Sequence, residues 1–396
     1  MLWSLSFLVA GTAAKILYAG VNESGGEFGV YSSSATPGTG LPGRFGMDYA
    51  FINKSTVDIF VQNDKINTFR VAFLLERMCP LEYGLGSKFN ETYYAEFKDA
   101  IDYITLTKGA YAVFDPHNYM RYNNPSQQPM TGSIIGSTSD PKAATTAQFQ
   151  SFWQELAGRF KDNEKVMYVY EQSNCGLMAN YLPGLISFGI MNEPHDMPTS
   201  LVLQNDQAAI DGIRAAGAKQ LILAPGNGYT GGHSWLESSQ GDEPSGNYLY
   251  KLSDPLNNTA IEVHEYLDQD FSGTHAECTQ PGPANLAALT GWLKQHGLKA
   301  VVGEIGGGAN ENCYSQLKDL LSYLETNEEY IGWLGWAAGP LWGTFRSCCG
   351  DDSGNLEPGT KAAGGTLPGG YDTIWANGIR PSIPTTLKRS GISSWQ

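Results

Sequence analysis

Polar and aromatic side chains recur in this sequence at the points where apolar, strand-like runs end, and Arg70 lies inside such a run. Eight of them are of types that perform or support chemistry: Arg70, His117, Asn192, Glu193, His264, Tyr266, Glu304 and Trp336. Two are glutamates, and a pair of carboxyl groups from separate strands is what cleavage of a glycosidic bond requires. One carboxyl group must be protonated to give a proton to the leaving oxygen. The other must be ionised to attack the anomeric carbon.

The neighbours of the two glutamates favour different roles for them. Arg70 and Tyr266 would stabilise an anion at Glu304. Glu193 would then take the higher pKa, partly because a negative charge lies nearby. This layout favours Glu193 as the acid and base and Glu304 as the nucleophile.

The elements that must position these residues alternate between strand and helix. Strand-like runs occupy Ile16–Asn22, Asn67–Phe73, Ala110–Pro116, Leu185–Met191, Gln220–Ala224, Ala260–Tyr266, Lys299–Glu304 and Ile331–Ala337. Helical patterns occupy Val57–Gln62, Tyr93–Thr107, Thr145–Phe160, Val202–Ala216, Pro283–His296 and Tyr314–Thr326. Eight strands separated by helices or long crossovers predict an α/β fold, a closed (β/α)8 TIM barrel, as a single domain over residues 15–396.

An open, doubly wound sheet is the alternative fold. It would place a glycine-rich phosphate loop after the first strand, but Gly25, Gly26 and Gly29 lack that spacing and no helix follows them. In a barrel, catalysis takes place at the carboxyl ends of the strands. A single histidine or tryptophan there would more often be a packing residue. Eight such residues on one rim indicate an active site.

Composition and charge limit the class of partner. The chain has 396 residues, 16% of them charged, and a formal net charge of −15. This charge argues against nucleic acid or an anionic membrane as partner and suits a neutral sugar polymer. Because none of the six cysteines has the spacing of a zinc site, we expect no metal, and we expect no other cofactor. We expect a monomer.

The N-terminus indicates secretion. The run from Leu2 to Ala14 is apolar, too short to span a membrane, and ends in small residues, so we expect residues 1–14 to be a signal peptide. No Lys or Arg precedes the run, which leaves open a buried N-terminal segment or a wrongly assigned start. Glycosylation sequons begin at Asn22, Asn53, Asn90 and Asn257. The first lies at the end of a predicted buried strand, so we expect it to be unused.

Several strings resemble glycoside hydrolase family 5, and most closely its fungal secreted endoglucanases. They are NTFRVAF, DPHNY, FGIMNEPHD, VHEYLDQDFSGTHAEC, VVGEIGGG and LGWAAGP. The resemblance runs from about Tyr18 to Trp336 and more weakly to the end. It implies that Glu193 is the acid/base, that Glu304 is the nucleophile, and that the remaining rim residues are Arg70, His117, Asn192, His264, Tyr266 and Trp336.

The resemblance also implies roles for individual residues. Asn192 would bind the sugar 2-hydroxyl, Trp336 would offer a flat face to that sugar ring, and Trp235 would be a platform at a neighbouring subsite, unless it only packs its loop. Cys278 and Cys313 match a family disulfide. Cys79 could pair with Cys348 or Cys349 on nearby loops. We see no cellulose-binding module.

The resemblance therefore predicts a retaining endo-β-1,4-glucanase acting on cellulose and related β-glucans. A β-mannanase or another β-glycanase of the same fold is one alternative, because subsite details decide between them. A non-catalytic carbohydrate-binding barrel is another. It would be expected to lack one glutamate, and this chain has both.

Residues 168–187 depart from the family pattern, which would run from Lys165-Val166 directly into Phe188-Gly189. A surface insertion is one interpretation. We favour a retained intron, since Met167-Tyr168-Val169 can encode a donor GTATGT, Ala179-Asn180 a branch point CTAAC and Ile186-Ser187 an acceptor TAG. Its removal keeps the reading frame and gives KVIFGIMNEP, a family-like fourth strand.

Overall fold

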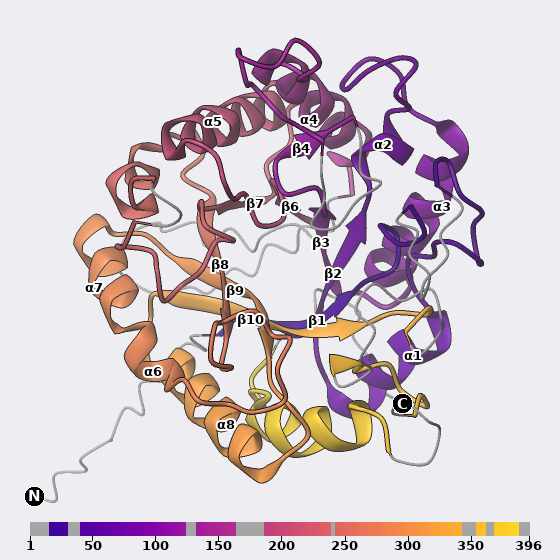
Figure 1. Ribbon diagram of the computed structural model, residues 1–396. Coiled ribbons are helices and arrows are strands. Elements are labelled where there is room, and N and C mark those ends of the chain that lie inside the picture. The colour runs from indigo at the N-terminus through magenta and orange to yellow at the C-terminus, as the bar shows by residue number, and fades with distance from the viewer. Residues whose placement is uncertain are drawn as a thin grey trace, which may run out of the picture.

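In the computed structural model, eight parallel strands close into a barrel, which confirms the predicted fold class (Figure 1). The structure describes residues 16–30, 40–123, 132–163, 186–238, 242–342, 354–361 and 368–387. In barrel order the strands are β1 (Tyr18–Glu23), β10 (Tyr330–Ala338), β9 (Ala300–Gly306), β8 (Thr259–Tyr266), β7 (Leu221–Pro225), β6 (Ile186–Gly189), β3 (Tyr111–Pro116) and β2 (Thr68–Phe73). A separate antiparallel pair, β4 (Arg121–Tyr122) and β5 (Ser133–Ile134), follows β3.

Helices surround the barrel in the order in which the sequence alternates. They are α1 (Lys54–Ile59), α2 (Leu75–Met78), α3 (Glu91–Asp102), α4 (Thr146–Phe160), α5 (Thr199–Ala215), α6 (Gly282–Asn285), α7 (Ala287–His296) and α8 (Glu311–Thr326). Two continue as π-helical turns, η1 (Phe60–Asp64) after α1 and η2 (Tyr103–Thr107) after α3. Between β7 and β8 the described residues form only two short 3-10 turns, η3 (Ser245–Asn247) and η4 (Leu249–Lys251).

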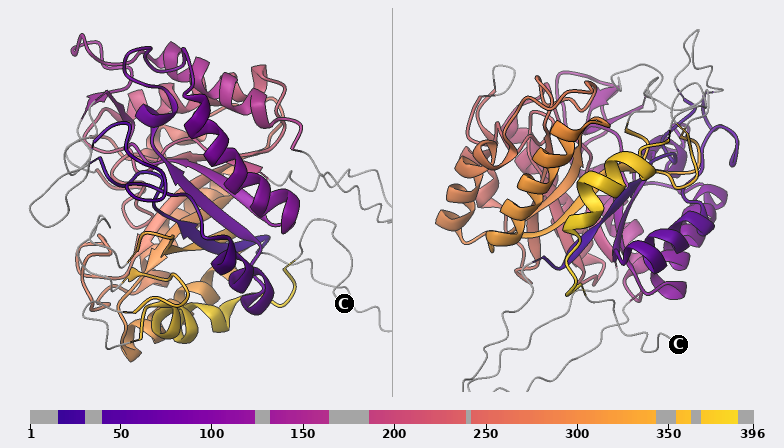
Figure 2. Two further views of the ribbon diagram at one scale, coloured as in Figure 1. Left: turned by 90° about the vertical axis from the view of Figure 1, so that its right-hand side faces the viewer. Right: turned by 90° about the horizontal axis from the view of Figure 1, so that it is seen from below.

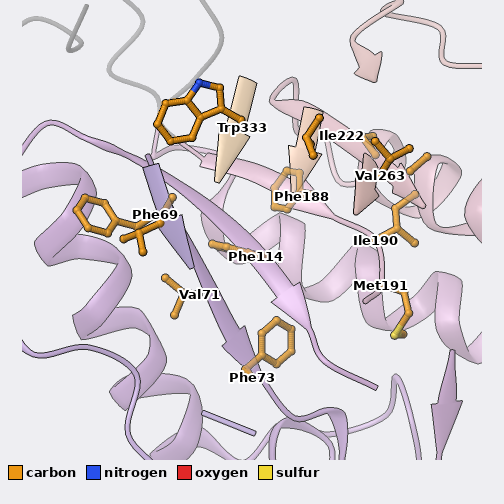
Figure 3. Packing of buried hydrophobic residues seen from close by; sticks show 14 of the residues in the cluster. Phe69, Val71, Phe73, Phe114, Phe188, Ile190, Met191, Ile222, Val263 and Trp333 are labelled. Carbon is orange, nitrogen blue, oxygen red and sulfur yellow. The ribbon is translucent and has the colours of Figure 1, made fainter. Parts of the chain in front are cut away.

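Alternation along each strand divides the core into two layers. Figure 3 shows Phe69, Val71 and Phe73 of β2 with Phe114 and Phe188 of the neighbouring strands. These residues face outward, and Phe97 of α3 and Trp153 of α4 pack against members of the row. A smaller inward-facing cluster fills the amino-terminal half of the barrel: Tyr18, Tyr111, Val113, Leu221, Leu223, Ala260, Val301 and Leu334. The inward-facing positions nearer the carboxyl ends of the strands are therefore left for polar residues.

The C-terminal part of the chain supplies the outer helix that covers β10 and β1. The π-helix η6 (Tyr371–Ile379) and the short turn η7 (Arg380–Ser382) lie beside α8, as the side views show (Figure 2). Trp375 is buried and packs edge-on against Phe60 of η1, and its indole nitrogen donates a hydrogen bond to Asp64. This part of the tail thus completes the ring of helices.

Candidate active site

Glu304 lies on β9 with its side chain directed into the barrel. Arg70 Nη1 donates a hydrogen bond to one carboxylate oxygen at 3.0 Å, and the Tyr266 hydroxyl donates to the other at 2.6 Å. Both oxygens thus accept hydrogen bonds of the kind that stabilise an ionised carboxylate. Burial raises the pKa of Glu304, while the positive charges of His264, Arg70 and His117 act against that rise. Glu304 is the more deeply buried of the two glutamates, with a side chain 4% exposed against 17% for Glu193.

Glu193 follows β6 and faces the same space from the other side of the barrel mouth. Its side chain is 17% exposed, and one of its oxygens lies 2.7 Å from His264 Nδ1. The backbone of Glu193 has φ of 41°, a left-handed conformation that costs energy in a residue other than glycine. Tyr119, Met120, Asp196, Tyr229 and Thr230 on the adjoining loops are also left-handed. Strain of this kind gathers at functional sites.

The two glutamates lie close together. One oxygen of Glu193, one oxygen of Glu304 and a ring nitrogen of His264 all lie within 4.8 Å of one another. Three such atoms could ligate a cation, but the Arg70 guanidinium is already hydrogen-bonded to Glu304 and would repel one. The cluster therefore fits acid–base and nucleophilic chemistry better than metal binding.

A buried polar network connects the remaining rim residues. Arg70 Nη2 donates a hydrogen bond to Asn192 Oδ1 at 2.8 Å, and Asn192 Nδ2 lies 3.2 Å from His117 Nε2. The His117 ring stacks on Trp336 with 5.2 Å between ring centroids and 22° between planes. Burial lowers the pKa of His117, but the adjacent Asp115 carboxylate outweighs it and brings the pKa to about 9. The structure thus brings all eight rim residues predicted from the sequence into one cluster.

The expectation for Trp235 is wrong. Its side chain is 1% exposed and packs edge-on against Trp292, so it has no open face for a sugar ring. A Cβ at Gly226 would lie 2.4 Å from the Trp235 ring, which shows how completely the ring fills the space beneath its loop. The exposed aromatic residue in the same string is Tyr229, which stacks on His195 at 4.2 Å and 11°. The string GNGYTGGHSW contained both aromatic residues, but nothing in it showed which of them is exposed.

Sequence reasoning also missed two buried carboxylates inside the barrel. Asp115 lies 2.9 Å from Arg70 Nη1, and Glu262 lies 2.9 Å from Arg70 Nε. The signal was present, since each stands two residues before a rim histidine on the same strand, His117 and His264.

The expected disulfide between Cys278 and Cys313 is present. The sulfurs are 2.08 Å apart, and the bond ties the loop after β8 to the first turn of α8. Cys79 is a buried free thiol, and its suggested partners Cys348 and Cys349 lie outside the described residues. So do residues 1–14 and most of 168–187, of which only Ile186 and Ser187 are described.

Two further observations concern the surface of the molecule. The Asn22 side chain is 1% exposed, and its amide donates hydrogen bonds to the carbonyl groups of Gly303 and Gly335. A glycan has no access to it, as expected for this sequon. Among the described residues, no helix has the length and apolar character needed to cross a membrane.

Comparison with known proteins places the chain in a family. The family model described as Cellulase (glycosyl hydrolase family 5) matches residues 21–171 and 181–341. Endoglucanase 1 of Robillarda sp. (strain Y-20) is 57% identical over 393 residues, which cover 99% of this chain and 96% of that protein. Endo-beta-1,4-glucanase B of Aspergillus niger is 37% identical over 338 residues, covering 84% of this chain and 85% of that protein.

Solved structures agree with this placement. XacCel5A in complex with cellopentaose has a TM-score of 0.71 and 30% identity, covering 93% of this chain and 99% of that one. Cel5A (EG2) from Hypocrea jecorina has a TM-score of 0.70 and 27% identity, covering 92% of this chain and 98% of that one. The resemblance seen in the sequence is thus confirmed, and the chain belongs to glycosyl hydrolase family 5, the cellulase family.

Proposed function

We propose that this protein is an endo-β-1,4-glucanase that hydrolyses internal bonds of cellulose and related β-glucans with retention of anomeric configuration. The observation that carries the mechanism is the short separation, within 4.8 Å, between oxygens of Glu193 and Glu304. Retaining enzymes hold their carboxyl groups about 5–5.5 Å apart, whereas inverting enzymes need about 6.5–9.5 Å to admit a water molecule. The names of the relatives, which are endoglucanases, support the choice of substrate.

The first step forms a covalent glycosyl-enzyme. The ionised Glu304 carboxylate attacks the anomeric carbon, and the bond from that carbon to the leaving oxygen breaks. Glu193 gives its proton to that oxygen, so the leaving chain departs as a neutral alcohol. Arg70 and Tyr266 hold the Glu304 carboxylate in position for this attack.

The second step returns both glutamates to their starting states. Glu193, now ionised, takes a proton from a water molecule, whose oxygen attacks the same anomeric carbon and releases Glu304. Two inversions at one carbon give net retention. Asn192 lies beside Arg70 and would bind the sugar 2-hydroxyl, while Trp336 would stack beneath the ring at the cleavage subsite.

Purified protein tests the substrate directly. We expect rapid loss of viscosity with carboxymethyl cellulose, slower action on glucomannan and little on mannan, and NMR of the first product should show the β-anomer. Faster cleavage of mannan would make the protein a β-mannanase. Binding of soluble glucan without hydrolysis would make it a carbohydrate-binding barrel.

We further propose that the protein is secreted as a monomer after loss of residues 1–14. The apolar run from Leu2 to Ala14 and the Cys278–Cys313 disulfide support this proposal, because disulfides form in oxidising compartments. N-terminal sequencing of protein from the culture medium should begin near Lys15. A chain that keeps residues 1–14 and stays in the cell would contradict it.

A further inference from the structure

Glu262 is a buried carboxylate for which the proposed mechanism has no use. It lies on β8 two residues before His264, so both side chains face the interior of the barrel. Glu262 is 1% exposed and lies beneath the two catalytic glutamates, among residues that contact them. A carboxylate so deeply buried is costly unless it interacts with positive charge.

Two cations supply that charge. Glu262 Oε1 lies 2.9 Å from Arg70 Nε and 3.8 Å from His264 Nε2. Both contacts are ion pairs that lack the geometry of a hydrogen bond. Within the described part of the chain, no hydrogen-bond partner is found for four buried atoms: Arg70 Nε, His264 Nε2 and the two carboxylate oxygens of Glu262. Glu262 therefore depends on Arg70 and His264 for electrostatic compensation, whereas Arg70 is also paired with Asp115. The buried Asp206 is a further carboxyl group close enough to act on Glu262 electrostatically.

The opposite ends of the same two cations contact the catalytic glutamates. Arg70 Nη1 donates to Glu304, and His264 Nδ1 lies 2.7 Å from Glu193 and 3.5 Å from Glu304. Burial lowers the pKa of His264, but Glu304, Glu193 and Glu262 together raise it to about 10. The imidazole is thus a cation held between Glu262 on one side and the catalytic pair on the other.

The neighbouring strand leaves room for this carboxylate. A Cβ at Gly303 would lie 2.4 Å from Glu262 Oε1 and 3.0 Å from its Cγ. The residue directly before Glu304 must therefore be glycine if Glu262 is to keep its place. Packing against Glu262 therefore explains why the residue before the proposed nucleophile is a glycine.

We propose that Glu262 is a positioning residue that orients Arg70 and His264 beneath the catalytic glutamates and balances their positive charge, an inference that rests on the proposed roles of Glu193 and Glu304. Without the charge of Glu262, Arg70 would keep Asp115 as a partner but His264 would lose one carboxylate, so the positive charge acting on the catalytic pair would increase. Both catalytic carboxyl groups would then ionise at lower pH, because nearby positive charge favours the ionised form. The loss of one contact would also loosen Arg70 and His264.

The pH dependence of kcat/KM on soluble β-glucan tests this. In Glu262→Gln we expect both limbs of the profile to move to lower pH by about one unit, and kcat/KM at its optimum to fall roughly ten- to hundred-fold. Glu262→Asp keeps the charge, so its limbs should return toward those of the parent even if kcat stays low. A purely structural role for Glu262 would lower the amount of folded enzyme without moving the limbs.

Glu265→Gln is the matched control. Glu265 is a fully buried carboxylate on the same strand, but it faces outward and accepts hydrogen bonds from His233 and Asn285. Its loss should leave both limbs in place. If Glu262→Gln fails to fold, Gly303→Ala displaces the carboxylate without removing its charge and should lower kcat while leaving the fold intact by circular dichroism.

If the parent enzyme is active and Glu262→Gln folds, but both limbs of its pH profile stay where they are in the parent, the role proposed for Glu262 is wrong and the proposed function still stands. Equal activity of parent and Gly303→Ala would contradict that role as well. A parent protein without activity on any β-glucan would instead overturn the proposed function.

Discussion

Arg70 is the residue that joins the parts of the active site. Its guanidinium group contacts Glu304, Asn192, Asp115 and Glu262, which lie on or directly after four different strands. Arginine suits this position because its planar group offers several donors in fixed directions. Residue types and their place on the strands were enough to predict that the eight rim residues meet, but Asp115 and Glu262, which also contact Arg70, were missed. Residue types and positions could not show which faces are exposed, because exposure depends on how the loops pack, as Trp235 and Tyr229 demonstrate.

Tyr229 provides a prediction at this scale. It is 36% exposed, its backbone N–H donates a hydrogen bond to the carbonyl group of Pro194, and its ring stacks on His195, so its loop packs on the segment that directly follows the proposed acid/base. If the ring stacks on a glucose unit, Tyr229→Ala should raise KM for soluble glucan about three- to ten-fold with little change in kcat. Steady-state kinetics would check this. Tyr250→Ala removes a similar tyrosine–histidine stack, on His296 of α7, and should leave KM unchanged.

The elements were predicted well where periodicity was strong. All eight barrel strands overlap the predicted runs, and α4 begins within one residue of its predicted start, where Thr145 forms a capping box with Gln148. The pair β4–β5 and the helix η6 were missed. Two-residue strands carry no periodic signal, and Gly and Pro around Tyr371–Ile379 hide a helix whose burial comes from contacts with η1 and α8.

The helix η6 gives a prediction of stability. Trp375 is fully buried between η6 and η1, so Trp375→Ala should lower the free energy of unfolding by about 3–5 kcal/mol. Urea denaturation followed by circular dichroism would measure it. Asn377→Ala, on the exposed side of the same helix, should change it by less than about 0.5 kcal/mol. Equal effects of the two changes would mean that η6 does not pack on the barrel.

The segment before β6 gives a second prediction at this scale. We propose that residues 168–187 come from a retained intron. The two segments matched by the family model leave out residues 172–180, inside this stretch. Ser187 also pairs with Val113 and Leu221, so it takes a buried inward position among apolar residues, where the spliced sequence has isoleucine.

Expression of both forms tests this proposal. A chain in which a single isoleucine replaces Met167–Ser187 should be active and should melt at a higher temperature than the longer chain. Complementary DNA from the source should lack the codons for Tyr168 to Leu185. A peptide from that stretch in the secreted protein would contradict the proposal.

The protein as a whole is strongly acidic, and its active site contains buried pairs of opposite charges. The net charge is −15, yet Arg70, His117 and His264 lie buried among the carboxylates of the site. The pKa of His117 is about 9 in the folded protein against an ordinary value of 6.5, so its charge contributes stability that is fully present below about pH 6.5. This contribution, on the order of 3 kcal/mol, is lost as pH rises through 9.

The free energy of unfolding should therefore fall between about pH 6.5 and 9, and it should fall less steeply in His117→Asn. Urea titrations at several pH values would show both slopes. Since the pKa of His264 is raised to about 10, part of the decline should continue above pH 9 in both proteins. A free energy of unfolding that rises over this range in the parent protein would show that His117 is not held as a cation.

The central claim is that Glu304 is the nucleophile and Glu193 the acid/base, and the anomer formed with azide tests it most directly. Glu304→Ala should lose activity on every substrate, and azide should attack an activated β-glucoside from the vacated side to give the α-glycosyl azide. Glu193→Ala should still form the glycosyl-enzyme from an aryl glycoside with a good leaving group, because that oxygen needs no proton. Azide should then release the β-glycosyl azide. NMR distinguishes the two products. The opposite pairing of anomers would reverse the roles, and activity lost only on cellulose in both variants would show that neither glutamate is the nucleophile.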